Sequence, residues 1–472
     1  MKLGLISLGC PKNLVDGEVM LGLARAAGHE ITTDPQSADV LVVNTCAFID
    51  AAKEESIDAI LEMAELKRSG RCRRLIVTGC LAERYREHLQ AEIPEIDVVL
   101  GTGEVPEIVR ALETRPSARP RPGAAPVTLY TSATDVRAQA GVLAVADPTE
   151  RPVPTYLYDA TTPRVLATPR HYAYVKVAEG CNYTCAFCII PTLRGPYRSR
   201  SEDSIVREAE ALAAGGVREL LLISQDTTFF GVDRGERHAL ARLLRRLDRV
   251  PGLAWIRLLY LYPTTISDQV LDAMAECDHV CKYIDLPLQH ASDAVLHRMR
   301  RPGTRATYDT LLARIRARVP GVALRTTFIV GFPGETDADV GELADFVRET
   351  GFDHLGVFTY SHEEGTRAHQ LSDDVPARMK TARRQRIMTL QETLVARRHR
   401  ARVGTTVRVL VDGPSDESPL VATGRLESQA PDIDSVVVLT DCDASTLPAG
   451  TFVEARVTGA RGYDLVAAPL PA

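Results

Sequence analysis

The sequence has 472 residues, more than one hydrophobic core usually organises, so it predicts a modular chain of roughly three domains. Hydrophobic residues make up 45% and charged residues 25%, a balance that excludes disordered, collagen-like and disulfide-dense classes. Lys and Arg number 56 against 62 Asp and Glu, a formal net charge of −6. The chain therefore has no global basic field, and any contact with a polyanion must be local.

The sequence shows no sign of a membrane or secreted protein. No stretch approaches the run of about 18 apolar residues that a membrane-spanning helix needs. The segment from Met1 to Cys10 has one Lys and a short apolar run, so it predicts a first strand and not a signal peptide. We expect a cytoplasmic protein, in which ten cysteines serve metal binding or catalysis because that compartment keeps thiols reduced.

Residues 1–115 are predicted to form an α/β domain, because short apolar runs alternate with helical patterns in the order typical of a parallel sheet. Strands are expected at 3–8, 40–43, 75–78 and 96–100. Helical spacing of apolar residues over 14–24 and 57–64 fills gaps between them. Residues 116–168 are rich in Pro, Ala, Thr and Arg, so they predict a linker with short edge strands at most.

Residues 169–402 are predicted to form a partial (β/α)6 barrel, because six further apolar runs alternate with helical segments. The expected strands are 174–178, 219–223, 255–259, 283–286, 324–330 and 355–358, and the expected helices include 202–214, 236–247 and 336–349. A long basic helix follows at 376–402. Its positive charge fits either a solvated face or a contact with nucleic acid.

Residues 403–472 are predicted to form a small antiparallel β-barrel of the oligonucleotide/oligosaccharide-binding kind, because short alternating runs are divided by Gly, Pro and Asp turns. Four Arg and no Lys stand against ten acidic residues: Asp412, Asp416, Glu417, Glu427, Asp432, Asp434, Asp441, Asp443, Glu454 and Asp464. This acidity favours a basic partner over RNA.

Three cysteines in one loop carry the strongest chemical signal of the sequence. Cys181, Cys185 and Cys188 lie within eight residues, directly after a predicted strand. Thiolates are soft ligands for iron–sulfur clusters, and three of them leave one iron of a four-iron cluster open. A zinc site is the alternative, but zinc sites favour paired two-residue spacings with a second Cys or His pair nearby.

A second set of three cysteines is spread over the first domain. Cys10, Cys46 and Cys80 each follow a predicted strand, at intervals of 36 and 34 residues that match one βα unit. A parallel sheet brings the carboxyl ends of its strands to one edge, so these thiols are expected to meet there and bind another cluster. Alternatively, they are three small buried residues at strand ends.

The remaining cysteines show no such pattern, and we interpret Cys72, Cys277, Cys281 and Cys442 as structural. No general acid or base stands out. His290, Asp226 and Tyr360 lie at predicted strand ends, where either a substrate or cofactor contact or a structural role is possible.

The Cys-x3-Cys-x2-Cys loop of the predicted barrel resembles the radical S-adenosylmethionine (SAM) superfamily. With the scattered first set and the small terminal barrel, nearly the whole chain resembles the methylthiotransferases within it. The resemblance implies that Cys10, Cys46 and Cys80 hold an auxiliary 4Fe-4S cluster, and that Cys181, Cys185 and Cys188 hold the radical-generating one. It also implies bound SAM, a reductase and a sulfur donor as partners, a TRAM-like terminal domain, and a C–SCH3 product.

The same resemblance implies which turns contact SAM and which substrate is modified. The glycine-bearing turns at Gly215, Gly216 and Gly331, with Glu335, are similar to the superfamily's SAM-contact turns. Local sequences at 7–13, 169–176, 225–228, 287–290 and 358–361 resemble the ribosomal branch, whose members modify an aspartate β-carbon of small-subunit ribosomal protein twelve. Two alternatives stay open: the branch that modifies a tRNA adenosine, and a non-catalytic iron–sulfur electron carrier.

Overall fold

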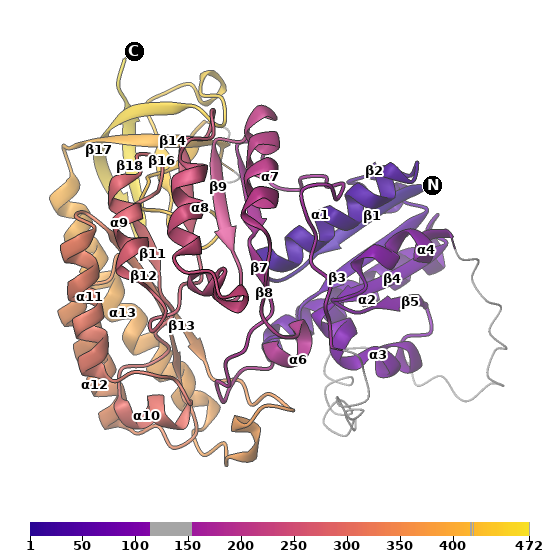
Figure 1. Ribbon diagram of the computed structural model, residues 1–472, viewed down its shortest axis with the longest axis horizontal. Helices are drawn as coiled ribbons and strands as arrows, with labels where there is room; N and C mark the ends of the chain where they lie inside the picture. The colour runs from indigo at the N-terminus through magenta and orange to yellow at the C-terminus, as the bar shows by residue number, and fades with distance from the viewer. Residues whose placement is uncertain (114–152, 416–417, 419, 472) are drawn as a thin grey trace.

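The structure is a computed structural model that describes residues 1–113, 153–415, 418 and 420–471. It confirms the predicted architecture of an amino-terminal α/β sheet domain, a central partial barrel and a small carboxyl-terminal β-barrel (Figure 1). Most of the predicted linker, residues 116–152, lies outside the described part of the chain. In the described ranges no helix is long and apolar enough to cross a membrane.

The amino-terminal domain is a five-stranded sheet in the order β2-β1-β3-β4-β5, and all its strand pairs are parallel. Its strands are β1 (Lys2–Ser7), β2 (Glu30–Thr32), β3 (Val40–Thr45), β4 (Arg74–Gly79) and β5 (Ile96–Leu100). The helices are α1 (Pro11–Ala26), α2 (Asp50–Ser69), α3 (Cys80–Glu92) and α4 (Ile108–Glu113). The sequence pattern missed β2, which has only three residues.

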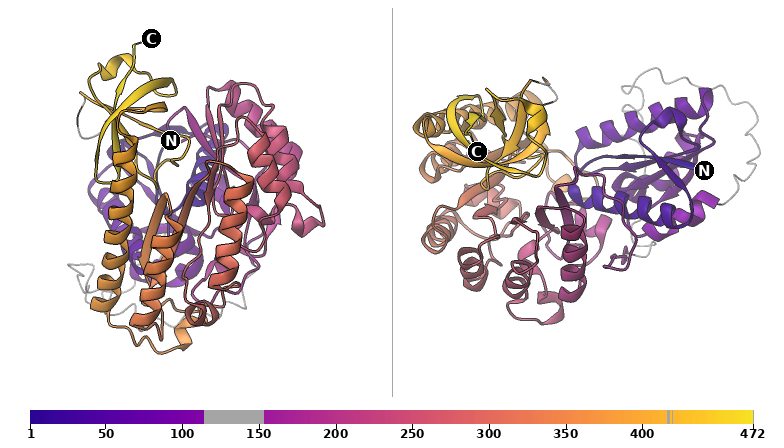
Figure 2. Two further views of the ribbon diagram at one scale, coloured as in Figure 1. Left: turned by 90° about the vertical axis from the view of Figure 1, so that its left-hand side faces the viewer. Right: turned by 90° about the horizontal axis from the view of Figure 1, so that it is seen from above.

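Helices cover both faces of this sheet (Figure 2). Successive side chains of β3 alternate between two hydrophobic clusters: Val40 and Val42 pack with α1 and α4, whereas Leu41 and Val43 pack with α2 and α3. A strand buried on both faces reads as a continuous apolar run, which is why β3 could be recognised in the sequence.

The central domain is a half-open barrel of two parallel three-stranded sheets, β10-β9-β6 and β11-β12-β13, which meet at a bridge between Ile256 and Val280. Its strands are β6 (Tyr172–Lys176), β9 (Glu219–Ile223), β10 (Trp255–Leu258), β11 (Tyr283–Asp285), β12 (Ala323–Val330) and β13 (His354–Thr359). The covering helices are α7 (Glu202–Ala214), α8 (Ala239–Leu247), α9 (Asp268–Glu276), α10 (Asp293–Arg298), α11 (Arg305–Arg318) and α12 (Asp337–Thr350). Helix α8 begins three residues later than predicted, after the left-handed turn residues Gly235 and His238.

Two short pieces extend the first strand of the barrel toward the cysteine loop. Strand β7 (Ala178–Glu179) pairs with β8 (Arg198–Ser199), and α6 (Ile190–Arg194) lies between them. Residues 153–168 run without regular secondary structure between α1 and α7. Arg164 fixes this segment, because its guanidinium contacts both Glu18 of α1 and Glu208 of α7. This part of the predicted linker is therefore packed between the two domains.

The carboxyl-terminal barrel closes in the order β14-β15-β16-β18-β17. Its strands are β14 (Thr406–Pro414), β15 (Ala422–Arg425), β16 (Val437–Leu439), β17 (Phe452–Arg461) and β18 (Asp464–Pro469). Four strand pairs are antiparallel as expected, but β16 and β18 run parallel. The barrel sits over the amino ends of the central strands, as Figure 1 shows for β9.

The basic helix α13 (Ala377–Arg402) joins the two barrels and packs along β13 and α12. Several of its cationic side chains have internal partners: Lys380 contacts Asp373, Arg383 contacts Glu335 and Arg398 contacts Asp353. The basic stretch is therefore partly a packing surface for the barrel.

Candidate active site

The first three predicted cysteines lie together at the carboxyl edge of the amino-terminal sheet. Cys46 directly follows β3, Cys80 directly follows β4, and Cys10 follows β1 as the N-cap of α1. Gly9 allows the close approach, since its φ is +87° and a Cβ on it would lie 2.9 Å from the Cys46 Sγ. A side chain at this position would displace that thiol.

Burial raises the thiol pKa of two members of the first triad, which we define as Cys10, Cys46 and Cys80. It raises the pKa of Cys46 to about 12, and the neighbouring thiols of Cys80 and Cys10 add to the rise. It also raises the pKa of Cys80, against the opposing effect of the Arg194 guanidinium. The Cys46 and Cys80 thiols hold their protons at neutral pH, so binding of iron to them would release protons.

The second triad, Cys181, Cys185 and Cys188, lies in the loop between β7 and α6 at the carboxyl edge of the barrel. Burial raises the pKa of Cys181 to about 11 and that of Cys188 to about 12, while backbone N–H groups that donate to both sulfurs oppose the rise. N–H donors of this kind also stabilise thiolates on a cluster.

Cationic and aromatic groups surround the middle cysteine of this loop. The Arg301 Nη1 lies 3.8 Å from the Cys185 Sγ, and the Tyr262 hydroxyl lies 4.0 Å from it. The Tyr262 ring stacks on Tyr183 with centroids 3.8 Å apart. Tyr183 in turn donates to Asp226, whose carboxylate is buried directly after β9.

Neither triad has the geometry of a single-ion site. Within the ranges that the structure describes, no three His, Cys, Asp or Glu side chains surround one metal-ion position. A cluster distributes its thiolates over different irons, so its ligands stand further apart than those of one zinc ion. The three thiols of the second triad, two of which have N–H donors on their sulfurs, fit such a cluster better than they fit zinc.

The structure brings most of the other predicted site residues to the carboxyl edge of the central barrel, where the second triad lies. Asp226 follows β9, Gly331 and Glu335 follow β12, and Tyr360 follows β13. His290 follows β11, is fully buried, and accepts a hydrogen bond from the Ser292 amide through Nδ1. In barrel enzymes, residues that contact the substrate or cofactor lie at this carboxyl edge.

The carboxylate of Glu335 is already committed within the protein. It accepts hydrogen bonds from the Gly331 amide at 2.8 and 2.9 Å and from Arg383 at 3.0 Å. Gly331 has a φ of +78°, and a Cβ there would collide with Lys380. This turn is therefore built by Glu335, and its glycine is required by backbone geometry.

Gly215 and Gly216 lie apart from the two triads. They end α7 and precede β9, which places them at the amino edge of the barrel. A turn before a parallel strand lies at the opposite edge from a turn after it. The structure thus does not bring these two glycines together with the cysteine loop.

A buried charge network that sequence reasoning missed joins the two triads across the domain interface. Arg194 at the end of α6 donates to Asp16 of α1 at 2.6 Å, to Glu179 at 3.2 Å, and toward the Cys80 Sγ at 3.6 Å. Lys176 lies 2.5 Å from both Asp16 and Glu179. The only hint in the sequence is that Arg194 follows Cys188 by six residues.

A second set of contacts closes the same interface beyond β13. Glu363 is buried, and its carboxylate binds Lys53 of α2 at 3.0 Å and Arg84 of α3 at 2.8 Å. Ser361 donates to Asp50 in the first turn of α2 at 2.8 Å. The helices that follow Cys46 and Cys80 are therefore tied to the carboxyl edge of the barrel.

The acidic residues of the terminal barrel are partly internal. Asp434 accepts from Tyr283 at 2.7 Å, and Asp412 lies 2.7 Å from His171. Asp432 accepts from Tyr174 and Glu427 accepts from the Lys282 amide, so four of the ten acidic residues contact the central domain. The acidity in the sequence therefore overstates the negative charge that this barrel offers to a partner.

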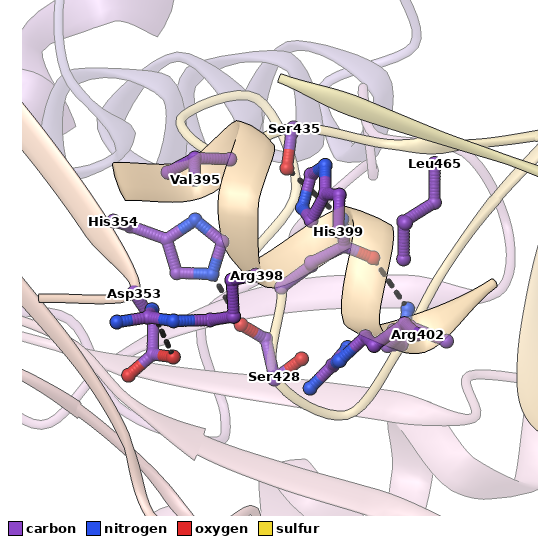
Figure 3. A pocket seen from close by; sticks show the side chains of 11 residues that line it. Asp353, His354, Val395, Arg398, His399, Arg402, Ser428, Ser435 and Leu465 are labelled. Atoms are coloured by element: carbon purple, nitrogen blue, oxygen red, sulfur yellow. Dashed lines mark hydrogen bonds and ion pairs between the residues drawn. The ribbon is translucent and has the colours of Figure 1, made fainter. Parts of the chain in front are cut away.

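A small cavity lies at the junction of α13 and the terminal barrel, and no cysteine of either triad lines it (Figure 3). Its volume is about 30 Å³, and Asp353, His354, Arg398 and His399 contribute to its lining. A space of this size holds water and no larger ligand.

The four remaining cysteines belong to separate hydrophobic clusters, as expected of structural residues: Cys72, Cys277, Cys281 and Cys442.

Family models match all three parts of the chain. Residues 2–101 match the uncharacterized protein family UPF0004, residues 175–347 match the radical SAM superfamily, and residues 403–470 match the TRAM domain. Among solved structures, the radical S-adenosylmethionine methyltransferase TsrM from Kitasatospora setae is similar in fold. Its TM-score is 0.53 at 18% identity, with 76% of this chain and 71% of that chain covered.

Curated relatives resemble the chain over its whole length. A protein of Solibacter usitatus named ribosomal protein uS12 methylthiotransferase RimO is 48% identical, covering 99% of this chain and 94% of the relative. The protein of the same name from Trichlorobacter lovleyi is 46% identical, covering 99% and 97%. Both extend through the two triads and the terminal barrel.

Proposed function

Because this chain belongs to the RimO family of radical SAM methylthiotransferases, we propose that it inserts sulfur and a methyl group at the β-carbon of an aspartate in ribosomal protein uS12. This protein is small-subunit protein twelve, the substrate expected from the local sequences of the ribosomal branch. Cys10, Cys46 and Cys80 are assigned to the auxiliary 4Fe-4S cluster. Cys181, Cys185 and Cys188 are assigned to the cluster that generates the radical.

The observation that carries this proposal is the contact between the first triad and the helix that follows the second. Arg194 closes the segment that begins with the second triad, and it reaches the Cys80 Sγ of the first. Asp16 and Glu179 hold its guanidinium in place from the two domains. A reaction that uses both clusters on one substrate requires the two triads to be held near each other, and this contact joins the two domains that carry them.

The chain's own residues would position the reactants and keep water away. When bound, the two clusters and SAM would supply the electron, the radical and the sulfur that the protein lacks. The Arg301 guanidinium lies beside the Cys185 sulfur, and the stacked rings of Tyr183 and Tyr262 form a wall next to it. Burial of the triads limits the access of solvent to reactive intermediates.

The proposal is tested by offering two substrates to the anaerobically reconstituted, reduced protein with SAM. Purified uS12 and a tRNA anticodon stem-loop are supplied in parallel, and mass spectrometry reads the products. We expect a methylthio gain on one aspartate of uS12 and none on the RNA. Gain on the RNA alone would move the enzyme to the tRNA branch, and SAM left uncleaved would support the electron-carrier alternative.

A further inference from the structure

Lys12 places its ammonium group between the first triad and the mouth of the barrel. It lies in the first turn of α1, two residues after Cys10, and only 7% of its surface is exposed. Its Nζ lies 3.0 Å from the centroid of the Tyr260 ring, and Tyr260 follows β10 at the carboxyl edge of the barrel. Lys12 therefore reaches from one domain into the other.

This lysine differs from the other buried cations of the interface in having no counterion. Lys176 and Arg194 both bind Asp16 and Glu179. In the part of the chain that the structure describes, Lys12 forms no ion pair, and the contact of its ammonium is with the ring face of Tyr260. A buried ammonium without an anion destabilises a fold, and a cation–π contact compensates only in part.

The carboxylate that binds the backbone of Tyr260 is already neutralised, and so is that of Glu179, which pairs with Lys176 and Arg194. Asp285 accepts from the Tyr260 amide at 3.0 Å, and it is paired with Arg325 at 2.9 Å. The negative charge of Asp285 is therefore shared with a guanidinium, and Lys12 keeps an unmatched positive charge. An anionic group of a bound ligand would satisfy it.

The backbone of the aromatic partner is held in an unfavourable conformation. Tyr260 has a φ of +60°, a left-handed value that bulky residues rarely adopt. Two hydrogen bonds fix it there: its amide donates to Asp285, and its carbonyl accepts from the Thr227 amide at 3.0 Å. Strain of this kind is concentrated at ligand clamps and catalytic sites. It holds the ring under the Lys12 ammonium.

We propose that Lys12 binds the side-chain carboxylate of the target aspartate and so presents the β-carbon next to the first triad. This assignment rests on the proposed function, because only an aspartate substrate brings a carboxylate bonded to the reacting carbon. Holding the carboxylate restricts the β-carbon to a small volume. An uncharged nucleobase brings no negative charge to match a buried ammonium, so Lys12 would also contribute to specificity.

The test measures binding, with full-length protein reconstituted with both clusters and without reductant, so that no turnover occurs. The probes are uS12 and uS12 in which the target aspartate is replaced by asparagine. We expect wild type to bind the aspartate form about tenfold more tightly, the size of one charge-assisted hydrogen bond. Lys12→Met, of similar length and uncharged, should bind both forms equally and the asparagine form as wild type does.

Lys2→Met is the matched control, because it removes one positive charge from the same domain. Its side chain is 37% exposed and pairs with Glu30 on the surface. This variant should keep the tenfold preference. Iron content confirms that each variant carries both clusters and is folded.

The assignment would be overturned if Lys12→Met kept the preference for the aspartate form. It would also be overturned if this variant lost affinity for both forms equally, because that result indicates a lysine with a structural role or one that contacts the cluster. The wild-type arm separates this from failure of the proposed function. If wild type binds neither form and methylthiolates the anticodon stem-loop, both proposals fall. If wild type modifies uS12 but Lys12→Met keeps the preference for the aspartate form, the Lys12 assignment alone falls.

Discussion

Replacing Arg194 by methionine should loosen the interface that joins the two triads. The Arg194 side chain is 3% exposed and has four polar neighbours: Asp16, Glu179, Asn13 and the thiol of Cys80. With Lys176, these groups form a buried set of two cations and two carboxylates. The substitution leaves one uncompensated negative charge in that set.

Removal of one partner from a buried ion pair costs about 3–5 kcal/mol, because the remaining charge stays desolvated. Lys176 still contacts both carboxylates, which favours the lower end of that range. Because Asp16 belongs to α1 and Glu179 to β7, the loss falls on the contact between the domains. Asp16→Asn in the same chain removes the excess charge and should restore part of the loss.

Hydrogen exchange of α1 and β6 amides in the cluster-free protein measures this effect. The free energy of opening should fall by about 3 kcal/mol in Arg194→Met. Arg207→Met is the matched control, because Arg207 is an exposed residue of α7, and its effect should stay within about 0.5 kcal/mol. Unchanged exchange in Arg194→Met would refute the claim that this network holds the domains together.

The same network predicts a pH dependence. Burial raises the pKa of Glu179, but the Lys176 ammonium and the Arg194 guanidinium outweigh it and hold that pKa well below the ordinary 4.5. A carboxylate with a depressed pKa contributes stability that is fully present above its unfolded pKa and is lost as the pH falls below it. Protection of α1 should therefore decline as the pH falls from about 4.5 toward the folded-state pKa of Glu179. The decline should be smaller in Arg194→Met, in which that pKa lies closer to its ordinary value.

Three further predictions follow from the site and the barrel contact. Cys185→Ala should abolish SAM cleavage, whereas Cys46→Ala should leave cleavage intact and stop sulfur transfer; methylthiolation by the Cys46 variant would contradict its assignment. Gly9→Ala should lower iron loading of the first triad, since a Cβ there meets the Cys46 thiol, and full loading would count against this geometry. Asp434→Asn should weaken docking of the terminal barrel by about 2 kcal/mol, read by fluorescence of Trp255, the single tryptophan; an unchanged midpoint of denaturation would refute it.

The strand-end cysteines show why so much of the site could be predicted from the sequence. Cys46 and Cys80 directly follow strands buried on both faces, and such strands are visible as continuous apolar runs. Parallel topology then requires that these residues share an edge. The basic helix and the strands of the central barrel were recognisable for the same reason, because their periodicity is local.

Contacts between domains could not be predicted in this way. Arg194 and Lys12 are separated from their partners by many residues, and nothing local distinguishes a buried cation from a surface one. The acidity of the terminal barrel misled for the same reason, since Asp434 is conspicuous as a charge in the sequence but buried against Tyr283 in the fold. The glycines at 215–216 were recognisable as a turn, but not as one at the amino edge.

The assignment of one cluster to each of the two triads is the central claim, and iron content tests it most directly. Anaerobic reconstitution of wild type, Cys46→Ala and Cys185→Ala is followed by measurement of iron and sulfide per chain. The account predicts about eight irons in wild type and about four in each variant, because each triad holds a four-iron cluster independently. About four irons in wild type, with loss of all of them in one variant and of none in the other, would contradict it.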